Sequence, residues 1–450
     1  MATLTSAFSP GVNSVPAVRG LPFIGNLLDF RRDRLSLQDN AAKVGPIARL
    51  HLAHIPLYVV TDAELAHEVF VVHADKYKKS RALQFLRPML GDGLLTSEGA
   101  THKRHRKLLA PAFAPKRLAA YGEVMVDETK RQLTGWRNGA RIDLAHEMME
   151  MTLAIAGKTM FGADVRRDAT AVAEGLELGM RAHQATLTSP LQVPFEWPLP
   201  RNRQMRKAVK LLDDVVYRLI AEGRARGTDK GDVLSILLLA RDEEDGTGLT
   251  DREIRDEVMT LLLAGHETTA NALTWTWFEL ARNPAALARL REELAPFGQR
   301  SVTTDDLPKL PWNAAVIDEA MRLHPPAYIT GREALEDITL GGHRLPKGSL
   351  VLLNIRGIHM REDYYRSAKS FAPERMLPDA KKARPRTQYL PFGAGPRVCI
   401  GSHFALLEAQ LALATMVQHA SLRMLSEHVV PEPLVTLRPR GGMPAVVERH

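Results

Sequence analysis

The chain has 450 residues, of which 45% are hydrophobic and 25% are charged, proportions that are ordinary for a soluble globular protein. Its formal net charge of +8 and its pI near 9.5 are compatible with nucleic acid, an anionic membrane surface or an acidic protein as a partner. No zinc-finger spacing or nucleic-acid-binding module accompanies this charge, so we expect no nucleic-acid partner. The single cysteine excludes an intramolecular disulfide and fits a reducing compartment.

The N-terminal residues lack the positively charged start and apolar run of a signal peptide. No stretch of about 18 apolar residues occurs, so the sequence predicts no spanning helix. We therefore expect a cytoplasmic protein without a membrane anchor.

The first part of the chain is predicted to be irregular and then to form a hairpin. Residues 1–35 form a lead-in rich in Pro and Gly. The runs 47–52 and 55–60 are β-prone and two residues apart, which predicts a β-hairpin. From about residue 61 to residue 240 the pattern is mostly helical, with Pro-containing breaks.

The longest of these breaks, residues 188–203, joins helical patterns at 167–186 and 204–226. It holds four prolines and, between them, Phe195 and Trp197. A loop of this length is either a functional lid or an ordinary surface excursion, and the sequence leaves both open.

A long buried helix is predicted for residues 250–282. Thr250 and Glu253 have the spacing of a capping box, and the pattern stops just before Pro284. At 1.5 Å per residue such a helix is roughly 48 Å long and crosses a whole domain. Its first half is apolar nearly all round, as expected of a helix surrounded by protein.

The last third is predicted to alternate between helices and short strands. It has a helix at 313–323, strands at 338–340 and 350–353, a loop at 384–401, a helix to about residue 419 and short β segments from residue 431. There is no internal repeat and no low-complexity linker. We therefore predict one mainly α domain with small β-sheets over residues 1–450.

The segment 392–401, which contains the only cysteine, has the features of a metal-binding loop. Glycines at 393, 395 and 401 let the backbone approach a large flat group closely. Arg397 and the start of the following helix favour a thiolate at Cys399. The alternative is a buried structural cysteine, which gains nothing from these neighbours. The pattern favours an iron ligand.

Polar residues interrupt the apolar run of the long helix at 265–269. Glu267 and Thr268 are costly to bury unless they are paired, and together with Gly265 they suggest a local opening of the helix. Thr268 is a candidate hydrogen-bond donor to bound dioxygen, and Glu267 a candidate proton source. The alternative is a Thr268 hydroxyl bonded to its own helix carbonyl.

Two further groups of charged residues are candidates for fixed roles. Glu319 and Arg322 share a helix face and can pair, with Arg375 as a third member, which we interpret as structural. His102 and Arg106 also share a face and could clamp carboxylates of a cofactor; the alternative is a solvated basic face, which we expect for Lys103, Arg104 and Lys107. Arg332, just after a Pro-containing turn, is a third candidate clamp.

These motifs together resemble the cytochrome P-450 family over essentially the whole chain. Residues 392–401 match its haem-binding signature, 264–268 its oxygen-activation motif, 319–322 with 373–376 its structural triad, and 102–106 the helix that contacts the haem propionates. Met376 stands where the family usually has Phe.

The resemblance implies a single-domain triangular fold with haem b between the long helix and the helix after the cysteine. Cys399 would be the axial iron ligand, and a thiolate in that position pushes electron density onto the iron and favours O–O cleavage. The implied contacts to the cofactor come from His102, Arg106, Arg332, Phe392, Gly393, Arg397 and Gly401. The implied reaction inserts one oxygen atom of O2 into a C–H or C=C bond of a small apolar substrate.

The resemblance also implies a separate ferredoxin-type or flavodoxin-type electron donor with its reductase, which would dock on Lys103, Arg104 and Lys107. A fatty acid or a terpenoid-like natural product is the favoured substrate. Family position suggests a pocket lined by Phe85, Leu86, Met89, Leu263, Ala264, Ala327, Tyr328 and Met443. A peroxide-driven haem peroxygenase and a non-enzymatic haem-binding protein are the alternatives, and both are disfavoured by Glu267 and Thr268.

Overall fold

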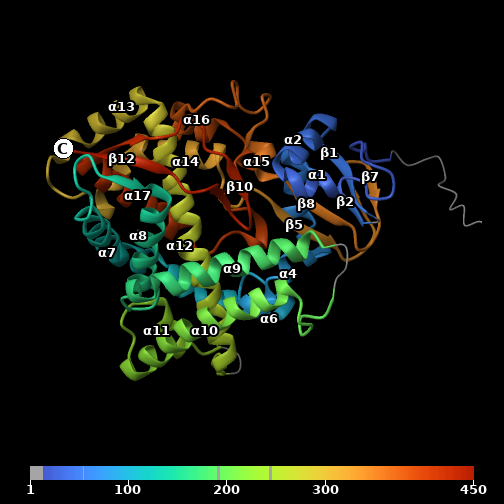
Figure 1. The fold of residues 1–450 in the computed structure, drawn as a ribbon, viewed down its shortest axis with the longest axis horizontal. Coiled ribbons are helices and arrows are strands. Elements are labelled where there is room, and N and C mark those ends of the chain that lie inside the picture. Colours follow the sequence, from blue (N-terminus) through green and yellow to red (C-terminus); the bar gives the residue numbers. More distant parts are fainter. Residues whose placement is uncertain (1–13, 54, 190–192, 243–245) are drawn as a thin grey trace, which may run out of the picture.

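The computed structural model describes residues 14–53, 55–189, 193–242 and 246–450. Within these ranges the chain is mainly helical, and Figure 1 shows a roughly triangular outline crossed by the longest helix, α12 (Asp251–Arg282). The other α-helices are α1 (Leu27–Arg32), α2 (Arg34–Val44), α3 (Ala63–His67), α4 (Arg81–Gln84), α5 (Arg87–Leu90), α6 (Gly99–Leu109), α7 (Pro115–Leu133), α8 (Leu144–Met160), α9 (Ala169–Leu187), α10 (Pro200–Arg226), α11 (Val233–Leu239), α13 (Pro284–Leu294), α14 (Pro311–Leu323), α15 (Ile355–His359), α16 (Pro378–Ala383) and α17 (Ser402–His419). The predicted fold class is confirmed.

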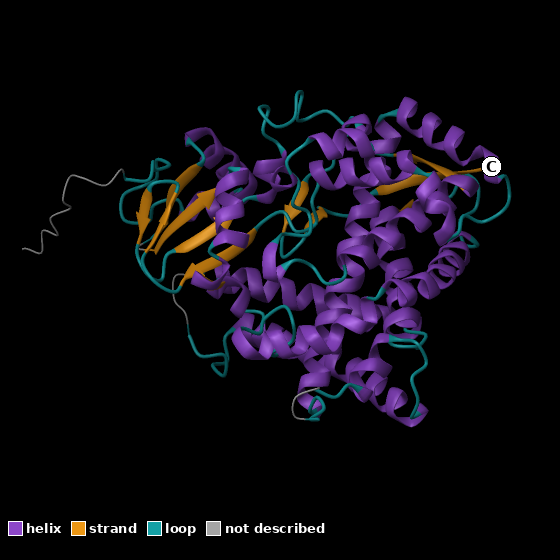
Figure 2. Ribbon diagram, turned by 180° about the vertical axis from the view of Figure 1, so that it is seen from behind, coloured by secondary structure: helices purple, strands orange, loops and turns teal. Residues whose placement is uncertain are grey.

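The strands gather into small sheets, of which the largest occupies one corner of the molecule (Figure 2). Its order is β1-β2-β8-β5-β3, and a second sheet has the order β4-β12-β9. Two hairpins, β6–β7 and β10–β11, complete the described strands. Their bounds are β1 (Ile47–Leu52), β2 (Ile55–Val60), β3 (Tyr77–Lys79), β4 (Arg141–Asp143), β5 (Thr330–Ala334), β6 (Ile338–Leu340), β7 (His343–Leu345), β8 (Leu350–Leu353), β9 (Ala420–Met424), β10 (Pro431–Pro433), β11 (Leu437–Pro439) and β12 (Pro444–Arg449).

Helix α12 is the centre of the main hydrophobic core. Its predicted capping box is present, since the Thr250 hydroxyl accepts from the Glu253 N–H while the Glu253 carboxylate accepts from the Thr250 N–H. Helices α8, α10, α14 and α17 all pack against it. Because neighbours cover most of its faces, even Trp275 and Trp277 are buried.

The lead-in prediction is wrong from residue 27 onward, because residues 27–32 form α1 and α2 begins at residue 34. Asp33 caps α2 by accepting a hydrogen bond from the Ser36 N–H at 3.0 Å. Leu37 and Ala41 of α2 then pack with the hydrophobic side chains of the β1–β2 hairpin. Helix α2 is therefore stabilised by its cap and by tertiary packing, although the sequence pattern around it predicted an irregular segment.

Other element boundaries also differ from the prediction. Helix α10 begins at Pro200 rather than 204, with the proline in its first turn, where its missing N–H costs nothing. Part of the 188–203 loop, residues 190–192, lies outside the described residues. Strands β3, β4, β5, β7 and β9 were not predicted, because strands of three to five residues are defined by their partners rather than by their own sequence. No helix in the described part of the chain is long and apolar enough to cross a membrane.

Candidate active site

The loop before α17 is shaped by two glycines with left-handed backbone conformations. Gly393 and Gly395 both have φ of +69°, which only glycine adopts without strain. A Cβ on Gly395 would overlap the carbonyl oxygen of Phe70, so no side chain fits there. A Cβ on Gly393 would meet nothing within 4 Å. At Gly395 the loop therefore packs tightly against the backbone of Phe70, whereas the space beside Gly393 is open.

Cys399 follows in this loop, three residues before α17 begins at Ser402. Its N–H donates to the carbonyl of Phe392 at 3.0 Å, which closes the loop. Cys399 is exposed, yet protein surrounds its thiol closely enough for burial to raise the pKa of the thiol. Both observations fit a thiol that points into an internal space.

Two groups partly offset the effect of burial on the pKa of Cys399: a backbone hydrogen bond from Gly401 and the positive charge of Arg106. Arg106 donates to the carbonyl of Val398 at 2.9 Å, directly beside the cysteine. Arg397, which was expected to support the thiolate, turns instead to the carbonyl of Ser97 and the carboxylate of Glu98. The electrostatic support thus comes from the Gly401 N–H in the loop and from Arg106 of α6, rather than from Arg397.

The middle of α12 has one accessible strip on an otherwise buried helix. Ala264 is exposed and Gly265 and Thr268 are half-buried, whereas Leu263 and Glu267 are buried. The Thr268 hydroxyl donates to the Ala264 carbonyl at 2.7 Å, which is the self-bonded alternative considered from the sequence. The expected local opening is absent, since α12 is continuous α-helix from Asp251 to Arg282.

Glu267 is fully buried on the other side of the same turn. Its Oε1 accepts from Arg438 Nε at 2.8 Å and from the Thr436 hydroxyl, while Oε2 has no hydrogen-bond partner. Arg438 lies on β11 and Thr436 just before it, so the β10–β11 hairpin determines how this carboxylate is held. No pattern in the sequence indicated this pairing.

A group of buried basic side chains lies around the Cys399 loop. Burial, with repulsion from Arg397, lowers the pKa of Arg332 to about 10, and burial with repulsion from Arg397 and Arg332 lowers that of Lys79 to about 7. Burial and the charges of Arg397 and Lys79 lower the pKa of His102 to about 3, so this imidazole is neutral. These groups shift the pKa values of one another because they lie close together in space, although they come from α6, β3, β5 and the loop.

Lys79 belongs to this group, although the sequence did not single it out. Strand β3 alternates, with Lys78 facing outward to Glu333 and Lys79 facing inward. Lys79 is paired in register with Arg332 of β5, so the two cations are neighbours across the strands. The period-two pattern of a three-residue strand is too short to reveal this by itself.

The residues fit a haem. The buried cations outnumber Glu98, the acid that acts on Lys79, Arg332 and Arg397, and such an excess of buried positive charge calls for an anionic ligand. The two carboxylates of haem b supply that charge. Cys399 offers the thiolate that iron accepts, and the small exposed Ala264 leaves room for a flat ring.

Comparison with known proteins agrees with this fit. The family model described as Cytochrome P450 matches residues 15–443. The chain belongs to the cytochrome P450 family. It therefore uses haem b, and as a P450 monooxygenase it acts with O2 on a hydrophobic substrate.

Curated bacterial P450 relatives match along nearly their whole length. Cyclooctatin synthase of Streptomyces melanosporofaciens is 38% identical, over 94% of this chain and 92% of that protein. Cyclooctat-9-en-7-ol 5-monooxygenase of the same species is 31% identical, over 95% and 94%. Pentalenene oxygenase of Streptomyces avermitilis is 33% identical, over 88% of each.

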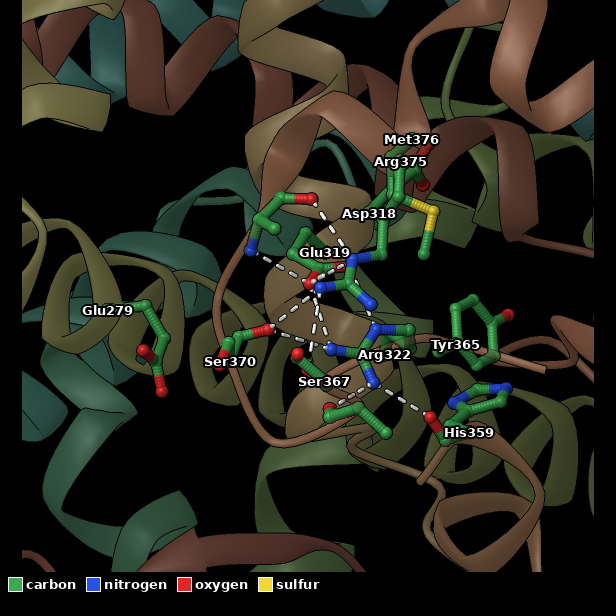
Figure 3. Close-up of polar contacts among 12 residues, drawn as sticks. Glu279, Asp318, Glu319, Arg322, His359, Tyr365, Ser367, Ser370, Arg375 and Met376 are labelled. Carbon is green, nitrogen blue, oxygen red and sulfur yellow. Dashed lines mark hydrogen bonds and ion pairs between the residues drawn. The ribbon is translucent and has the colours of Figure 1, made fainter. Parts of the chain in front are cut away.

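The three residues of the predicted structural triad of this P450 meet in the structure (Figure 3). Glu319 and Arg322 of α14 are fully buried and form a two-pronged ion pair with both N–O distances 2.8 Å. Arg375 Nε lies 3.2 Å from Glu319 Oε1. Arg322 also donates to the carbonyls of His359, Ala368 and Ser370, which ties the segment before the Cys399 loop to α14.

Most of the residues expected to line the substrate pocket are buried or half-buried in the structure. Leu86, Met89 and Leu263 are buried, Phe85 is half-buried, and Tyr328 is buried beside the exposed Ala327. Met443 is buried as well, and its backbone lies at the start of α8, where its N–H donates to Asp143 and its carbonyl accepts from the Leu144 N–H. Thr436, between β10 and β11, contacts Glu267 of α12.

Proposed function

We propose that this P450 hydroxylates or epoxidises a terpenoid-like substrate with electrons from a separate donor protein. The observation that carries the proposal is the accessible Cys399 together with the accessible strip of Ala264 and Thr268 on a buried helix. The relatives support the substrate class, since two of them are named for cyclooctatin chemistry and one for pentalenene.

Haem b held by Cys399 supplies the activation of dioxygen, which a thiolate ligand promotes. The protein's part is to place the substrate, exclude water and deliver protons. The Thr268 hydroxyl is the group of α12 nearest the accessible strip that can donate a hydrogen bond, after release of its bond to the Ala264 carbonyl. Glu267, on the same turn, is the carboxylate that can pass protons toward it.

The apolar wall of the pocket is formed by α5 and α12. Met89 packs so close to α9 that a Cβ on Gly179 would meet its sulfur at 2.5 Å. Leu263 supplies the apolar surface on α12 next to the accessible Ala264. Rigid apolar walls of this kind select a hydrocarbon skeleton by shape and orient one of its C–H or C=C bonds.

We place the docking site of the electron donor on the exposed face of α6. Lys103 is exposed there, and Arg106 of the same helix reaches the carbonyl next to Cys399. Arg104 is engaged with Glu253 of α12, so it holds the fold together and offers less to a partner. In Lys103→Glu the rate of donor-to-haem electron transfer should fall and lose part of its salt dependence. Lys210→Glu, a change on α10, is the control; equal rates in the two variants would contradict this docking site.

The proposed function is tested by spectra and turnover. The reduced protein with carbon monoxide should show the red-shifted Soret band of thiolate ligation, and Cys399→Ser should lose it. Turnover of a cyclic terpene with a ferredoxin or flavodoxin system should exceed turnover with hydrogen peroxide. A histidine-type Soret band, or peroxide turnover that is far faster, would overturn the proposal.

A further inference from the structure

Arg34, at the start of α2, is a buried cation without an anionic partner. Its side chain is 7% exposed, and its Nη1 donates to the Tyr328 hydroxyl at 3.3 Å and to the Pro433 carbonyl at 3.2 Å. Its Nε and Nη2 are buried and make no hydrogen bond. No carboxylate in the described part of the chain lies within ion-pair distance of it. The face of its guanidinium rests on the ring of Phe30, 4.4 Å from the centroid.

Two further buried polar side chains near Arg34 lack partners. Gln38 lies one helical turn later on the same face of α2, and neither its Nε2 nor its Oε1 is hydrogen-bonded. His183 of α9 is buried with its Nδ1 unpartnered. Burial and the nearby charge of Arg34 lower the pKa of His183 to about 4, so at neutral pH the imidazole adds no charge of its own. We call Arg34, Gln38 and His183 the Arg34 cluster.

Such a cluster is unusual because buried polar groups in folded proteins nearly always find partners, and a buried unpaired charge is costly. The free nitrogens of Arg34 are informative. Nε and Nη2 are the two adjacent donors on one edge of the guanidinium, and this edge matches the two oxygens of a carboxylate. The other nitrogen, Nη1, is already used by Tyr328 and Pro433. The edge that binds an anion is the edge left free.

The Arg34 cluster is linked by a hydrogen bond to Tyr328, one of the residues that we expect to line the substrate pocket. Tyr328 follows the exposed Ala327, and its hydroxyl donates to the carbonyl of Leu434 at 3.1 Å. Two residues later, Thr436 bonds Glu267 and accepts from Asn271 Nδ2 of α12. A path of hydrogen bonds and short chain segments therefore joins Arg34 to the oxygen-activation turn through the β10–β11 hairpin.

We propose that the Arg34 cluster binds the carboxylate of an apolar acid, so that the substrate of this P450 is a terpenoid or fatty acid anchored at its acid end. The inference rests on the proposed function, because it names the polar group of the substrate of that same site. The free edge of Arg34 pairs with the carboxylate, and Gln38 and His183 offer further hydrogen bonds. Because the free nitrogens are closed off from water, the side chains packed around them must move as the acid enters.

The test compares acids with their matched alcohols. Binding of abietic acid and its primary alcohol, and of dodecanoic acid and dodecanol, is measured by calorimetry on the haem-loaded protein. The wild-type protein should prefer the acid of at least one pair, and Arg34→Gln should lose about 10- to 100-fold in affinity for that acid with little change for the alcohol. Arg32→Gln, an exposed change on the neighbouring helix α1, should bind like the wild type. The pair that shows the preference tells whether the acid is a terpenoid or a fatty acid.

A second measurement separates a binding role from a structural one. If the role of Arg34 is to bind a ligand rather than to stabilise the fold, Arg34→Met should unfold at the same temperature as the wild type or at a higher one. The reason is that this substitution removes a buried unpaired charge. Equal affinity for acid and alcohol in the wild type, no binding of either acid, or clear destabilisation of Arg34→Met would each overturn the proposal. A normal carbon monoxide spectrum alongside any of these results would leave the monooxygenase function standing.

Discussion

Arg438 of β11 and Glu267 of α12, which are 171 positions apart, form a buried ion pair in which Arg438 Nε lies 2.8 Å from Glu267 Oε1. The carboxylate of Glu267 raises the pKa of Arg438, so the guanidinium stays charged. The pair fixes the acid of the oxygen-activation turn, and the second oxygen of that acid is left without a partner. The position of Glu267, the proposed proton source, therefore depends on the β10–β11 hairpin.

Removing the guanidinium should expose this dependence. Arg438→Gln leaves a buried carboxylate unpaired, and we expect a loss of about 3 kcal/mol in the free energy of unfolding. Glu267→Gln in the same background should recover part of that loss, because the uncompensated charge disappears. Chemical denaturation of the two single variants and the double variant measures the coupling. Arg440→Gln, an exposed change on the same segment, is the control, and additive effects of the two changes would contradict a buried pair.

Thr268 is predicted to act in coupling reductant use to product formation. Thr268→Ala should still fold, bind haem and consume reductant, but product formation should fall by about 100-fold or more as electrons are diverted to peroxide. The measurement is product and hydrogen peroxide per reductant consumed. Thr276→Ala is a matched control, because Thr276 makes the same 2.7 Å bond to its own helix but is buried away from the accessible strip. Full coupling in Thr268→Ala would contradict the assigned role.

Lys79 should make the stability of the haem-free protein depend on pH. Burial lowers its pKa in the folded state from the usual 10.5 to about 7, so between these values the unfolded chain binds more protons. Stability should therefore rise with pH from about 7 to about 10, by roughly 4 kcal/mol at most. Lys79→Met should flatten this rise and be the more stable protein at pH 7. The unfolding free energy against pH is the measurement.

Haem provides the control for this effect. Its carboxylates should restore the charged form of Lys79, so the rise in stability between pH 7 and 10 should be much smaller in the haem-loaded protein. A pH dependence that is identical with and without haem would show that Lys79 does not face the cofactor.

The ion pair of Glu319 and Arg322 is predicted to hold the segment that leads to the Cys399 loop. In Glu319→Gln the fully buried Arg322 and the neighbouring Arg375 lose their counter-charge, and we expect a loss of about 3–5 kcal/mol in stability together with poor retention of haem. Glu374→Gln, which changes an exposed glutamate beside Arg375, should behave like the wild type. Thermal unfolding and the haem-to-protein absorbance ratio measure both effects.

Local chemistry in the sequence was enough for several parts of the fold. The capping box of Thr250 and Glu253 predicted the start of α12, and Asn283-Pro284 its end, because both signals act through the helix's own backbone. The β1–β2 hairpin was also predicted from a local signal, two β-prone runs that are two residues apart. Residues 27–32 and 34–35 were mispredicted because α1 and α2 depend on packing against a sheet that the local sequence does not reveal.

What the sequence by itself determined is the chemistry that neighbours in the chain provide: a cysteine among glycines, a threonine beside a glutamate, and an arginine one helical turn after a glutamate. What the tertiary structure decided is which distant groups face them. Arg438 reaches Glu267, Arg106 rather than Arg397 stands beside Cys399, and Lys79 joins the buried cations, each from a different element. The physical reason is that burial and charge depend on distance in space, and short strands such as β3 and β11 carry no pattern long enough to predict where their side chains point.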